Sequence, residues 1–456
     1  MEPTETRIER GFGRVLTPLE NFIYKQTTAG FLLFIAAFVS MVLANSPWNG
    51  LFEAFAAMEL GFIAHDFRMV FSLREWTSSG LMALFFFLIG LEIKREILAG
   101  KLREMQHVRP ILVAAAGGMV VPAALYWMVN GQNDAAHGWA IPMATDTAFA
   151  IAALALFAKR ASPGIAIFLA ALAIFDDIGA ILVVAFFYTR QLDTAYLIQA
   201  AIALAALSAL NILGVRRGWT YAVVGVMLWW FVHQSGVHAT VAGLLGALAV
   251  PARTQLGQGG FTEKMKAALS VFEQKFDFGR RIIESPEQHS LAMEFERTVK
   301  SAVTPLQRWH TLLLTPVGII VLPLFALLSA GIDLSGESLV ELLSSSVTMG
   351  VVAGLAIGKP LGIVLFTAIA LKLKVGKLPA GMSMAEIVSV GLLSGIGFTM
   401  SLFITTLSFQ EHPEFIEPAK LGIIAGSLAS AIAAWAWTIV IGRRKANRYQ
   451  ENLTIS

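Results

Sequence analysis

Long apolar runs are the feature that most restricts what this 456-residue chain can fold into. A helix of about 20 apolar residues spans the roughly 30 Å core of a bilayer, and tilt accommodates shorter or longer runs. We count twelve such runs, at residues 28–46, 78–93, 108–129, 139–158, 164–188, 194–214, 218–232, 236–251, 311–331, 345–371, 383–408 and 418–441. The seventh and eighth are separated by only three residues. The sequence therefore predicts an all-α polytopic membrane protein with about twelve transmembrane helices.

Composition excludes several other classes of protein. Hydrophobic residues make up 56% of the chain and charged residues only 14%, too few charges to cover a soluble surface. The absence of cysteine excludes a disulfide scaffold. A net charge of +3, without basic patches interleaved with aromatic residues, does not indicate nucleic-acid binding. The runs lack the period-two alternation of barrel strands, and the polar N-terminus does not resemble a signal peptide.

Basic residues alternate between the two sides of the predicted bundle, as the positive-inside rule requires. With the N-terminus inside, all but five of the 34 Lys and Arg residues fall on inner segments; the five are Arg68, Arg74, Arg190, Lys359 and Lys420. We therefore expect both termini to be cytoplasmic. The expected organisation is an N-terminal segment at 1–27, a transmembrane domain at 28–441 and a basic tail at 442–456.

One long polar insertion interrupts the predicted transmembrane domain, at residues 252–310. Its apolar residues recur at helical spacing in two groups, which the Ser285-Pro286 pair separates. The first group is Met265, Leu269, Phe272 and Phe276, and the second is Leu291, Phe295, Val299 and Val303. This pattern predicts two amphipathic helices at the inner membrane surface. A solvated linker with incidental apolar residues is the alternative.

The outer stretch 58–75 has the alternation of a β-hairpin, with apolar residues on either side of His65-Asp66. Two strands alone are marginally stable in water. We therefore expect the hairpin to pair with a second copy of the chain, giving a homodimer.

Four charged residues lie near the centres of predicted spans: Asp146, Asp176, Asp177 and Lys359. Each charge at mid-bilayer costs about 2.5–3.5 kcal/mol. Asp146 could serve only as a helix N-cap, and Asp176 only as the ion-pair partner of Lys359. A structural role explains Asp177 less well, because three carboxylates and one ammonium leave excess negative charge in the membrane. Such an imbalance attracts a cation or protons.

Hydroxyl groups next to Asp146, on Thr145 and Thr147, add further oxygen atoms. A compact site made only of oxygen ligands suits a hard cation. Because a low dielectric favours the neutral form of a carboxylic acid, protons should compete with the cation for the same oxygens.

Helix breakers interrupt the fourth and eleventh predicted spans. Pro142 lies in the fourth, and Ser394-Gly395-Ile396-Gly397 lies in the eleventh. Spans 3–5 and 10–12 are seven apart, so corresponding helices run in opposite directions. This indicates an inverted-topology repeat with two broken helices crossing at mid-membrane, where half-helix ends point at an ion. The alternative is that the glycines only permit tight helix packing.

The motifs around these residues resemble the NhaA family of bacterial Na⁺/H⁺ antiporters, itself a standard example of an inverted repeat. Eight matching stretches occur in order along the chain. They are 80–83, 90–96, Ala144-Thr145-Asp146-Thr147-Ala148-Phe149-Ala150, 172–180 with Asp176-Asp177, 235–240, 322–326, 357–362 with Lys359-Pro360, and Gly395-Ile396-Gly397-Phe398-Thr399-Met400-Ser401. Eight motifs in order are far more specific than one.

The resemblance implies a secondary transporter rather than an enzyme. It would exchange cytoplasmic Na⁺ (or Li⁺) for external protons by alternating access, electrogenically, in the bacterial inner membrane, serving sodium and pH homeostasis. No cofactor and no nucleic-acid partner are expected.

The resemblance also implies roles for individual residues. Asp177 would be the principal Na⁺- and proton-exchanging carboxylate, with Asp176 as its partner and Lys359 paired to Asp176. Asp146 and Thr145 would lie where the broken helices cross, beside the segment of Gly395, Gly397 and Thr399. Glu92, Arg95 and Glu96 match a charged cluster linked to pH response, as does the position of His238, which is equally explained as a core histidine.

The chain departs from the family at three places, one of which is the 252–310 insertion, longer than the family's usual loop. Ser78-Ser79 stands where the family usually has Asn-Asp, and Leu306-Gln307-Arg308 stands nearest to a usual Leu-Glu-His. These changes put the family's pH switch in doubt for this chain.

Three functions outside this class are the alternatives. An intramembrane aspartyl protease would need two acids on separate helices, typically with Gly near one Asp, whereas here Asp146 follows Thr and Asp177 follows Asp. A passive cation channel would use the same acids without strict coupling. A membrane scaffold gives no reason for Asp176 and Asp177 at the centre of a span. A cation/proton exchanger for K⁺ is barely distinguishable from a Na⁺ exchanger by sequence.

Overall fold

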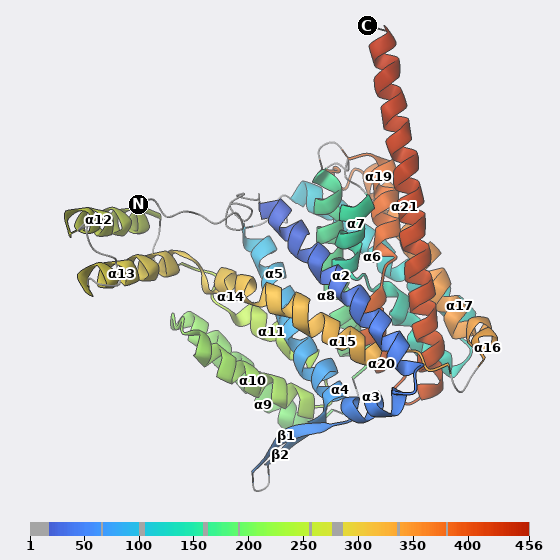
Figure 1. Ribbon diagram of the computed structural model, residues 1–456, viewed down its shortest axis with the longest axis horizontal. Coiled ribbons are helices and arrows are strands. Elements are labelled where there is room, and N and C mark those ends of the chain that lie inside the picture. The colour runs from blue at the N-terminus through green and yellow to red at the C-terminus, as the bar shows by residue number, and fades with distance from the viewer. Residues whose placement is uncertain are drawn as a thin grey trace. The chain divides into compact units, whose positions relative to one another are not determined.

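The computed structural model describes residues 18–64, 67–99, 105–157, 163–189, 192–254, 258–275, 286–334, 338–379 and 382–455. Across these ranges the chain is helical apart from one two-stranded sheet (Figure 1). It divides into two compact units, which are described separately. The first unit comprises 1–82, 101–189 and 315–456, and the second comprises 83–100 and 190–314.

The first unit holds most of the helices. In chain order its elements are α2 (Pro18–Ala44), α3 (Asn49–Ala56), β1 (Glu59–Ala64), β2 (Phe67–Ser72), α4 (Leu73–Glu75), η1 (Trp76–Leu81), α6 (Met105–Asn130), η3 (Asp134–Met143), α7 (Thr147–Phe157), α8 (Pro163–Phe187), η5 (Val317–Val321), α15 (Leu322–Ser329), α16 (Leu339–Ser344), α17 (Ser346–Ala353), η6 (Gly354–Gly358), α18 (Lys359–Lys372), α19 (Met384–Ser394), α20 (Phe398–Ser408), η7 (Pro413–Phe415) and α21 (Ile416–Ile455).

The second unit is smaller. It contains α9 (Thr194–Ile212), α10 (Gly218–Gln234), α11 (Thr240–Ala249), α12 (Gln258–Lys275) and α13 (Pro286–Ala302), together with all but the first residue of α5 (Met82–Ala99) and all but the last two of α14 (Pro305–Pro316). Within it, Lys94 on α5 donates hydrogen bonds to the carbonyls of Leu248 and Val250 at the C-terminal end of α11. These bonds satisfy carbonyl groups that the end of a helix leaves without partners.

Eight helices in the described ranges are long and apolar enough to cross a membrane, and two bent helix pairs bring the number to as many as ten. The other two predicted spans, 218–232 and 236–251, correspond to α10 with 17 residues and α11 with 10. Both are shorter than the ~20 residues that a straight span needs. A polytopic membrane protein is therefore confirmed, whereas twelve spans and the inverted repeat stay predictions.

Exposed apolar side chains agree with a lipid environment. On α2, Phe31, Phe34 and Phe38 are each more than half exposed, at spacings that place them on one face of the helix. A water-soluble surface rarely carries such a continuous stripe of large aromatic residues. This face of α2 is therefore suited to contact with lipid chains.

Both predicted interruptions are present as bends between short helices. η3 and α7 meet at 46°, and α19 and α20 meet at 48°. A β-carbon added at Gly395 would lie 2.5 Å from the Leu355 carbonyl oxygen, and one at Gly397 would lie 3.0 Å from the Ala144 carbonyl oxygen. Gly395 and Gly397 are therefore required because neighbouring backbone leaves no room for a side chain. The bend between α19 and α20 and tight packing occur at the same place.

The hydrophobic core of the first unit surrounds the two bends. Buried side chains from α6, α7, α8, α18, α19 and α21 form one cluster; its fully buried members include Ala150, Phe168, Leu172, Ile363 and Val390. α21 passes beside both α19 and α20 (Figure 1). The polar groups at the bends are therefore enclosed by tightly packed apolar residues.

The predicted hairpin is present as strands β1 and β2. They pair antiparallel, with Leu60 opposite Phe71 and Phe62 opposite Met69. The predicted turn residues His65 and Asp66 lie outside the described residues, as does 1–17 of the predicted N-terminal segment.

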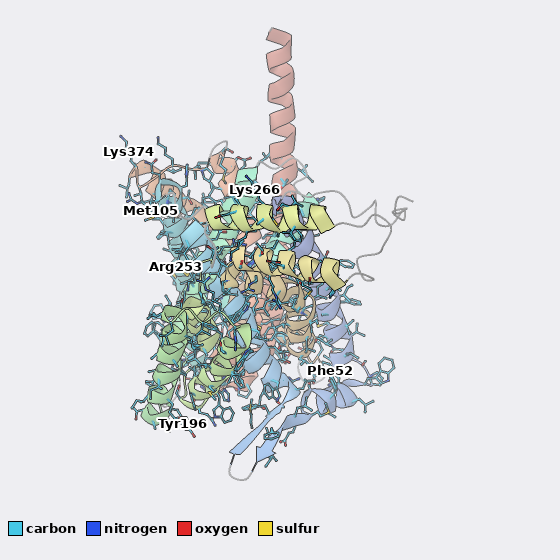
Figure 2. All side chains as sticks on the ribbon, turned by 90° about the vertical axis from the view of Figure 1, so that its left-hand side faces the viewer. Phe52, Met105, Tyr196, Arg253, Lys266 and Lys374 are labelled. Atoms are coloured by element: carbon cyan, nitrogen blue, oxygen red, sulfur yellow. The ribbon has the colours of Figure 1, made fainter. Side chains whose placement is uncertain are left out.

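The insertion folds into two helices, α12 and α13, and Pro286 begins the second of them. The two lie side by side (Figure 1), and Lys266 on α12 is labelled in Figure 2. Ala268 and Thr298 are buried, whereas Leu269 and Val299 are exposed. The insertion thus contains two helices, whereas their placement at the inner membrane surface stays a prediction; Phe276 and Ser285 lie outside the described residues.

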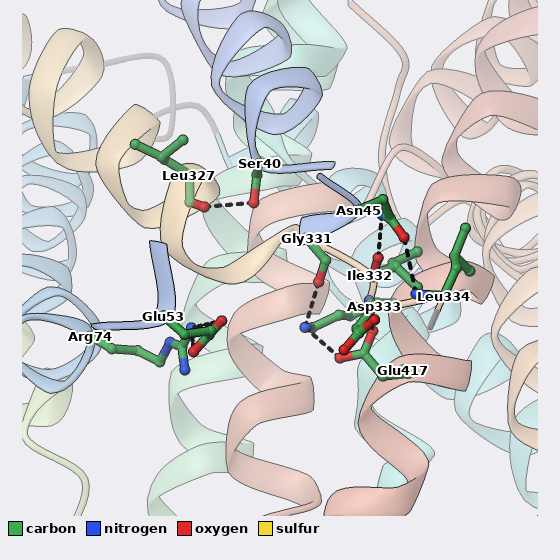
Figure 3. A network of polar contacts seen from close by, with 11 residues as sticks. Ser40, Asn45, Glu53, Arg74, Leu327, Gly331, Ile332, Asp333, Leu334 and Glu417 are labelled. Carbon is green, nitrogen blue, oxygen red and sulfur yellow. Dashed lines mark hydrogen bonds and ion pairs between the residues drawn. The ribbon is translucent and has the colours of Figure 1, made fainter. Parts of the chain in front are cut away.

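A polar network closes one end of the first unit around the loop that follows α15 (Figure 3). Ser40 of α2 donates a hydrogen bond to the Leu327 carbonyl. Asn45, which directly follows α2, donates one to the Ile332 carbonyl. Lys420 on α21 donates to the Gly331 carbonyl and is paired with Glu417 at 2.8 Å. Three segments distant in sequence are thereby joined.

Helices α6 and α18 are in close contact where two glycines face each other. A β-carbon at Gly362 would lie 2.1 Å from the Gly117 carbonyl oxygen, which is backbone and cannot swing aside. We expect Gly362→Ala to lower the free energy of unfolding by about 1–3 kcal/mol, because it forces the helices apart. Thermal unfolding in detergent measures the change. Gly225→Ala on α10, where nothing lies within 4 Å, is the matched control and should be neutral or slightly stabilising.

Candidate ion-binding site

A buried ion pair joins α8 to α18. Lys359 Nζ lies 2.9 Å from Asp176 Oδ2, and both side chains are fully buried. Lys359 is the first residue of α18, directly after the π-helical turn η6. It also donates a hydrogen bond to the carbonyl of Met143, the last residue of η3. The ammonium group therefore faces one carboxylate and the negative end of a half-helix, which offsets part of its desolvation cost.

Asp146 lies between the N-terminal ends of two half-helices, α7 and α20. Its Oδ1 accepts a hydrogen bond of 3.1 Å from the Phe149 backbone N–H, which makes Asp146 the N-cap of α7. Its Oδ2 accepts bonds from the backbone N–H of Thr399 at 3.0 Å and from the Thr399 hydroxyl at 2.5 Å. One carboxylate thus faces two positive helix ends. Asp146 is therefore an N-cap of α7 that also binds the N-terminal end of α20.

Thr145 connects the ion pair to the second bend. Its hydroxyl oxygen lies 2.7 Å from Asp176 Oδ2 and 3.0 Å from the carbonyl oxygen of Ser394, the last residue of α19. Thr145, Asp176 and Ser394 are all at most 1% exposed. Thr145, at the bend between η3 and α7, therefore contacts both the Asp176 carboxylate and the C-terminal end of α19.

Backbone contacts hold the two bends against each other. The Asp146 N–H donates to the Ile396 carbonyl at 2.7 Å, and the Ser401 hydroxyl donates to the Ile141 carbonyl at 2.8 Å. The Gly397 N–H is near the Ser427 hydroxyl of α21, at 3.3 Å. The polar backbone that both bends expose is thus paired inside the protein, as an apolar environment requires.

Asp177 follows Asp176 on α8 and is 5% exposed. Its carboxylate interacts electrostatically with Lys359. Consecutive helical residues are about 100° apart, so Asp177 faces a different direction from Asp176. The two carboxylates therefore share a position along α8 without sharing the same contacts.

The structure brings together most of the residues that the sequence predicted. Asp176, Lys359 and Thr145 form one set of contacts, and Asp146 and Thr399 form another. The two sets are adjacent because Thr145 and Asp146 are consecutive residues, and Gly395 and Gly397 supply the second bend. Sequence reasoning missed two backbone carbonyls, those of Met143 and Ser394. Their only sequence signal is their place at the C-terminal end of a broken half-helix, where carbonyls lack helical partners.

The predicted pH-response residues lie in the second unit. Arg95 contacts Glu96 at 3.0 Å and Glu92 at 3.9 Å, so these three residues do form a charged cluster on α5. His238 Nδ1 lies 2.8 Å from the Thr240 hydroxyl at the start of α11. This contact is what a satisfied histidine makes, and it does not by itself indicate a sensor.

The donor atoms of the site are oxygens from carboxylates, a hydroxyl and backbone carbonyls. Such ligands suit hard cations. In the described part of the chain, no three His, Cys, Asp or Glu residues are grouped closely enough to hold a metal ion. The oxygen atoms at the bends come from the carboxylates of Asp146 and Asp176, the hydroxyls of Thr145 and Thr399, and the ends of half-helices.

Comparison with known proteins agrees with this architecture. The family model described as Na⁺/H⁺ antiporter 1 matches residues 20–438. The chain belongs to the NhaA family of Na⁺/H⁺ antiporters. NhaA 1 of Pseudoalteromonas atlantica is 43% identical over 93% of this chain and 90% of its own length. NhaA 2 of Psychromonas ingrahamii is 40% identical over 96% and 92%, and NhaA of Sulfurimonas denitrificans is 38% identical over 95% and 98%.

Breaking the buried ion pair of this NhaA-family protein should be costly. We expect Lys359→Met to lower the free energy of unfolding by about 3–5 kcal/mol near neutral pH, because it leaves Asp176 charged and buried. The loss should shrink as the pH falls, since protonation removes that charge. Unfolding in detergent, followed by intrinsic fluorescence, measures both effects.

The double variant Lys359→Met/Asp176→Asn removes both charges and should lose much less stability than Lys359→Met alone. Lys420→Met, which breaks a more exposed pair with Glu417, is the control and should cost about 1 kcal/mol or less. Equal losses in the single and double variants would contradict the coupling.

Proposed function

We propose that this protein exchanges Na⁺ or Li⁺ from the cytoplasm for external protons, at a site formed by Asp176, Asp177 and Thr145. The observation that carries the proposal is the enclosure of two adjacent carboxylates beside Lys359 and Thr145, where two broken helices meet. The names of the relatives as Na⁺/H⁺ antiporters support the same conclusion.

Competition between the cation and protons supplies the coupling. A bare alkali ion and a proton both neutralise a buried carboxylate, and a charged group without compensation is expensive in the membrane. The carboxylates therefore release the alkali ion only as they bind protons, and release protons only as they bind the ion. Alternating access then opens the site to each side in turn, and the bends at residues 144–146 and 395–397 supply helix ends that can move relative to their partners.

The cycle is electrogenic in this proposal. If two acids change protonation state in each cycle, two protons cross for each Na⁺, and one net charge moves. The membrane potential contributes about 2.3 kcal/mol per charge per 100 mV. A potential that is negative inside then drives Na⁺ out of the cell.

The organisation in the membrane is part of the same proposal. We infer an inner-membrane protein with both termini cytoplasmic, an inverted repeat relating spans 3–5 to spans 10–12, and α12 and α13 at the inner surface. Glu92, Arg95, Glu96 and His238 remain the candidates for a response to pH.

Replacing the principal carboxylate should abolish exchange. We expect Asp177→Asn in proteoliposomes to reduce Na⁺-driven proton flux to that of empty vesicles, because an amide cannot alternate between binding a cation and binding a proton. A pH-sensitive dye reports the flux as Na⁺, Li⁺ and K⁺ are added in turn. In the unmodified protein, a potential set by valinomycin and K⁺ should change the rate of Na⁺-driven flux. Asp134→Asn, an exposed acid at the start of η3, is the matched control and should keep full flux.

Full flux with Asp177→Asn would refute the carboxylate assignment, and a rate independent of membrane potential would refute electrogenic exchange. A conductance above carrier rates would instead indicate a cation channel. Flux with K⁺ alone would indicate the K⁺ alternative.

We also propose that the β1–β2 hairpin joins two copies of the chain. The hairpin is a two-stranded sheet among the described residues, and its Leu60, Phe62 and Ile63 are exposed. We expect Phe62→Glu to shift the protein from dimer towards monomer, measured by native mass spectrometry from detergent. Leu373→Glu, an exposed residue just after α18, is the control and should leave the oligomeric state unchanged. A monomeric unmodified protein would exclude this interface.

A further inference from the structure

Ser394 carries a hydroxyl group that no described residue binds. It is the last residue of α19, and its side-chain oxygen is buried without a hydrogen-bond partner among the described residues. The residue is 0% exposed. Burying a hydroxyl without a partner costs free energy, so such a group needs an explanation.

The usual solution for a helical hydroxyl is absent at Ser394. Elsewhere in the chain, buried hydroxyl groups donate to the carbonyl four residues earlier, as Thr367 does to Ile363 at 2.6 Å and Thr405 does to Ser401 at 2.8 Å. Ser394 makes no such bond within the described ranges. The Ser394 hydroxyl therefore does not bond to its own helix, although the carbonyl four residues earlier is the usual local partner.

A second buried oxygen without a hydrogen-bond partner belongs to the same set of contacts. Asp176 Oδ2 is bonded by Lys359 and Thr145, but no described residue hydrogen-bonds Asp176 Oδ1. Thr145 links the two residues, because its hydroxyl contacts both Asp176 Oδ2 and the Ser394 carbonyl. Covalent geometry keeps the Ser394 hydroxyl within a few ångströms of its own carbonyl.

We propose that Ser394 is a ligand of the transported alkali cation and helps to select among alkali ions. Its hydroxyl oxygen joins Asp176 Oδ1 and the Thr145 hydroxyl in an oxygen-only set, which is the chemistry that a hard monovalent cation prefers. The inference rests on the proposed Na⁺/H⁺ exchange. The Ser394 hydroxyl would contribute a neutral oxygen ligand from the end of α19, whereas the acids Asp176 and Asp177 lie on α8.

A ligand role and a structural role predict opposite effects on stability. If Ser394 is a ligand, Ser394→Ala removes an unpaired hydroxyl, so the melting temperature in choline buffer should stay the same or rise. The stabilisation by added Na⁺ should then require about fivefold to tenfold more Na⁺, the loss of one polar contact. If the hydroxyl were only structural, the melting temperature would fall equally with and without Na⁺, which would overturn the inference.

Transport gives the second measurement. In proteoliposomes Ser394→Ala should raise the half-saturating Na⁺ concentration by about fivefold to tenfold with the maximal rate retained, and it should change the ratio of Li⁺ to Na⁺ affinity. Ser394→Thr keeps the hydroxyl and should keep the affinity. The matched control is Ser389→Ala, because Ser389 is a buried serine of the same helix whose hydroxyl does bond to a carbonyl, that of Ala385.

The outcomes separate the two proposals. Unmodified protein without Na⁺-driven proton flux overturns the proposed function and this inference with it. Normal flux in the unmodified protein, together with unchanged Na⁺ affinity and ion preference in Ser394→Ala, overturns the role of Ser394 alone.

Discussion

Compensation of charge by helix ends is the interaction on which the rest of this structure depends. Two bent helix pairs put four helix ends in a buried place, and each end carries a partial charge. Asp146 faces the N-terminal ends of α7 and α20, and Lys359 faces the C-terminal end of η3 as well as Asp176. Without these two side chains, the bends would leave backbone dipoles exposed to an apolar core. Asp146 and Lys359 therefore stabilise the fold as well as belonging to the candidate site.

The same arrangement explains why the core around the site is so tightly packed. Gly395 and Gly397 allow the second bend to touch the backbone at Leu355 and Ala144. Hydrophobic residues of six helices then close around the crossing. Low dielectric in this enclosure strengthens each electrostatic contact and raises the cost of each charge that lacks one.

Much of this could be predicted from the sequence, because the features involved are local and costly. Asp146, Asp177 and Lys359 stand out since charges are rare at the centre of apolar runs, and Pro142 and Gly395 mark the bends. The alternation of apolar residues predicted the β1–β2 hairpin, and helical spacing together with Pro286 predicted the two helices of the insertion. Contacts through backbone atoms could not be predicted, since the Met143 and Ser394 carbonyls have no side-chain signature. The break between α10 and α11 was predicted, but the length of α11, only 10 residues, was not, because a short apolar helix and half of a long one look alike in sequence.

The Thr145 hydroxyl has one hydrogen and two acceptors within reach. While Asp176 is ionised, that hydrogen is drawn to the carboxylate at 2.7 Å, and the Ser394 carbonyl receives no share of it. Once Asp176 carries a proton, its own O–H can donate to Thr145, and the threonine hydrogen turns to Ser394. A proton that binds Asp176 would therefore change the hydrogen bond at the end of α19 through rotation about the Cβ–O bond of Thr145 alone.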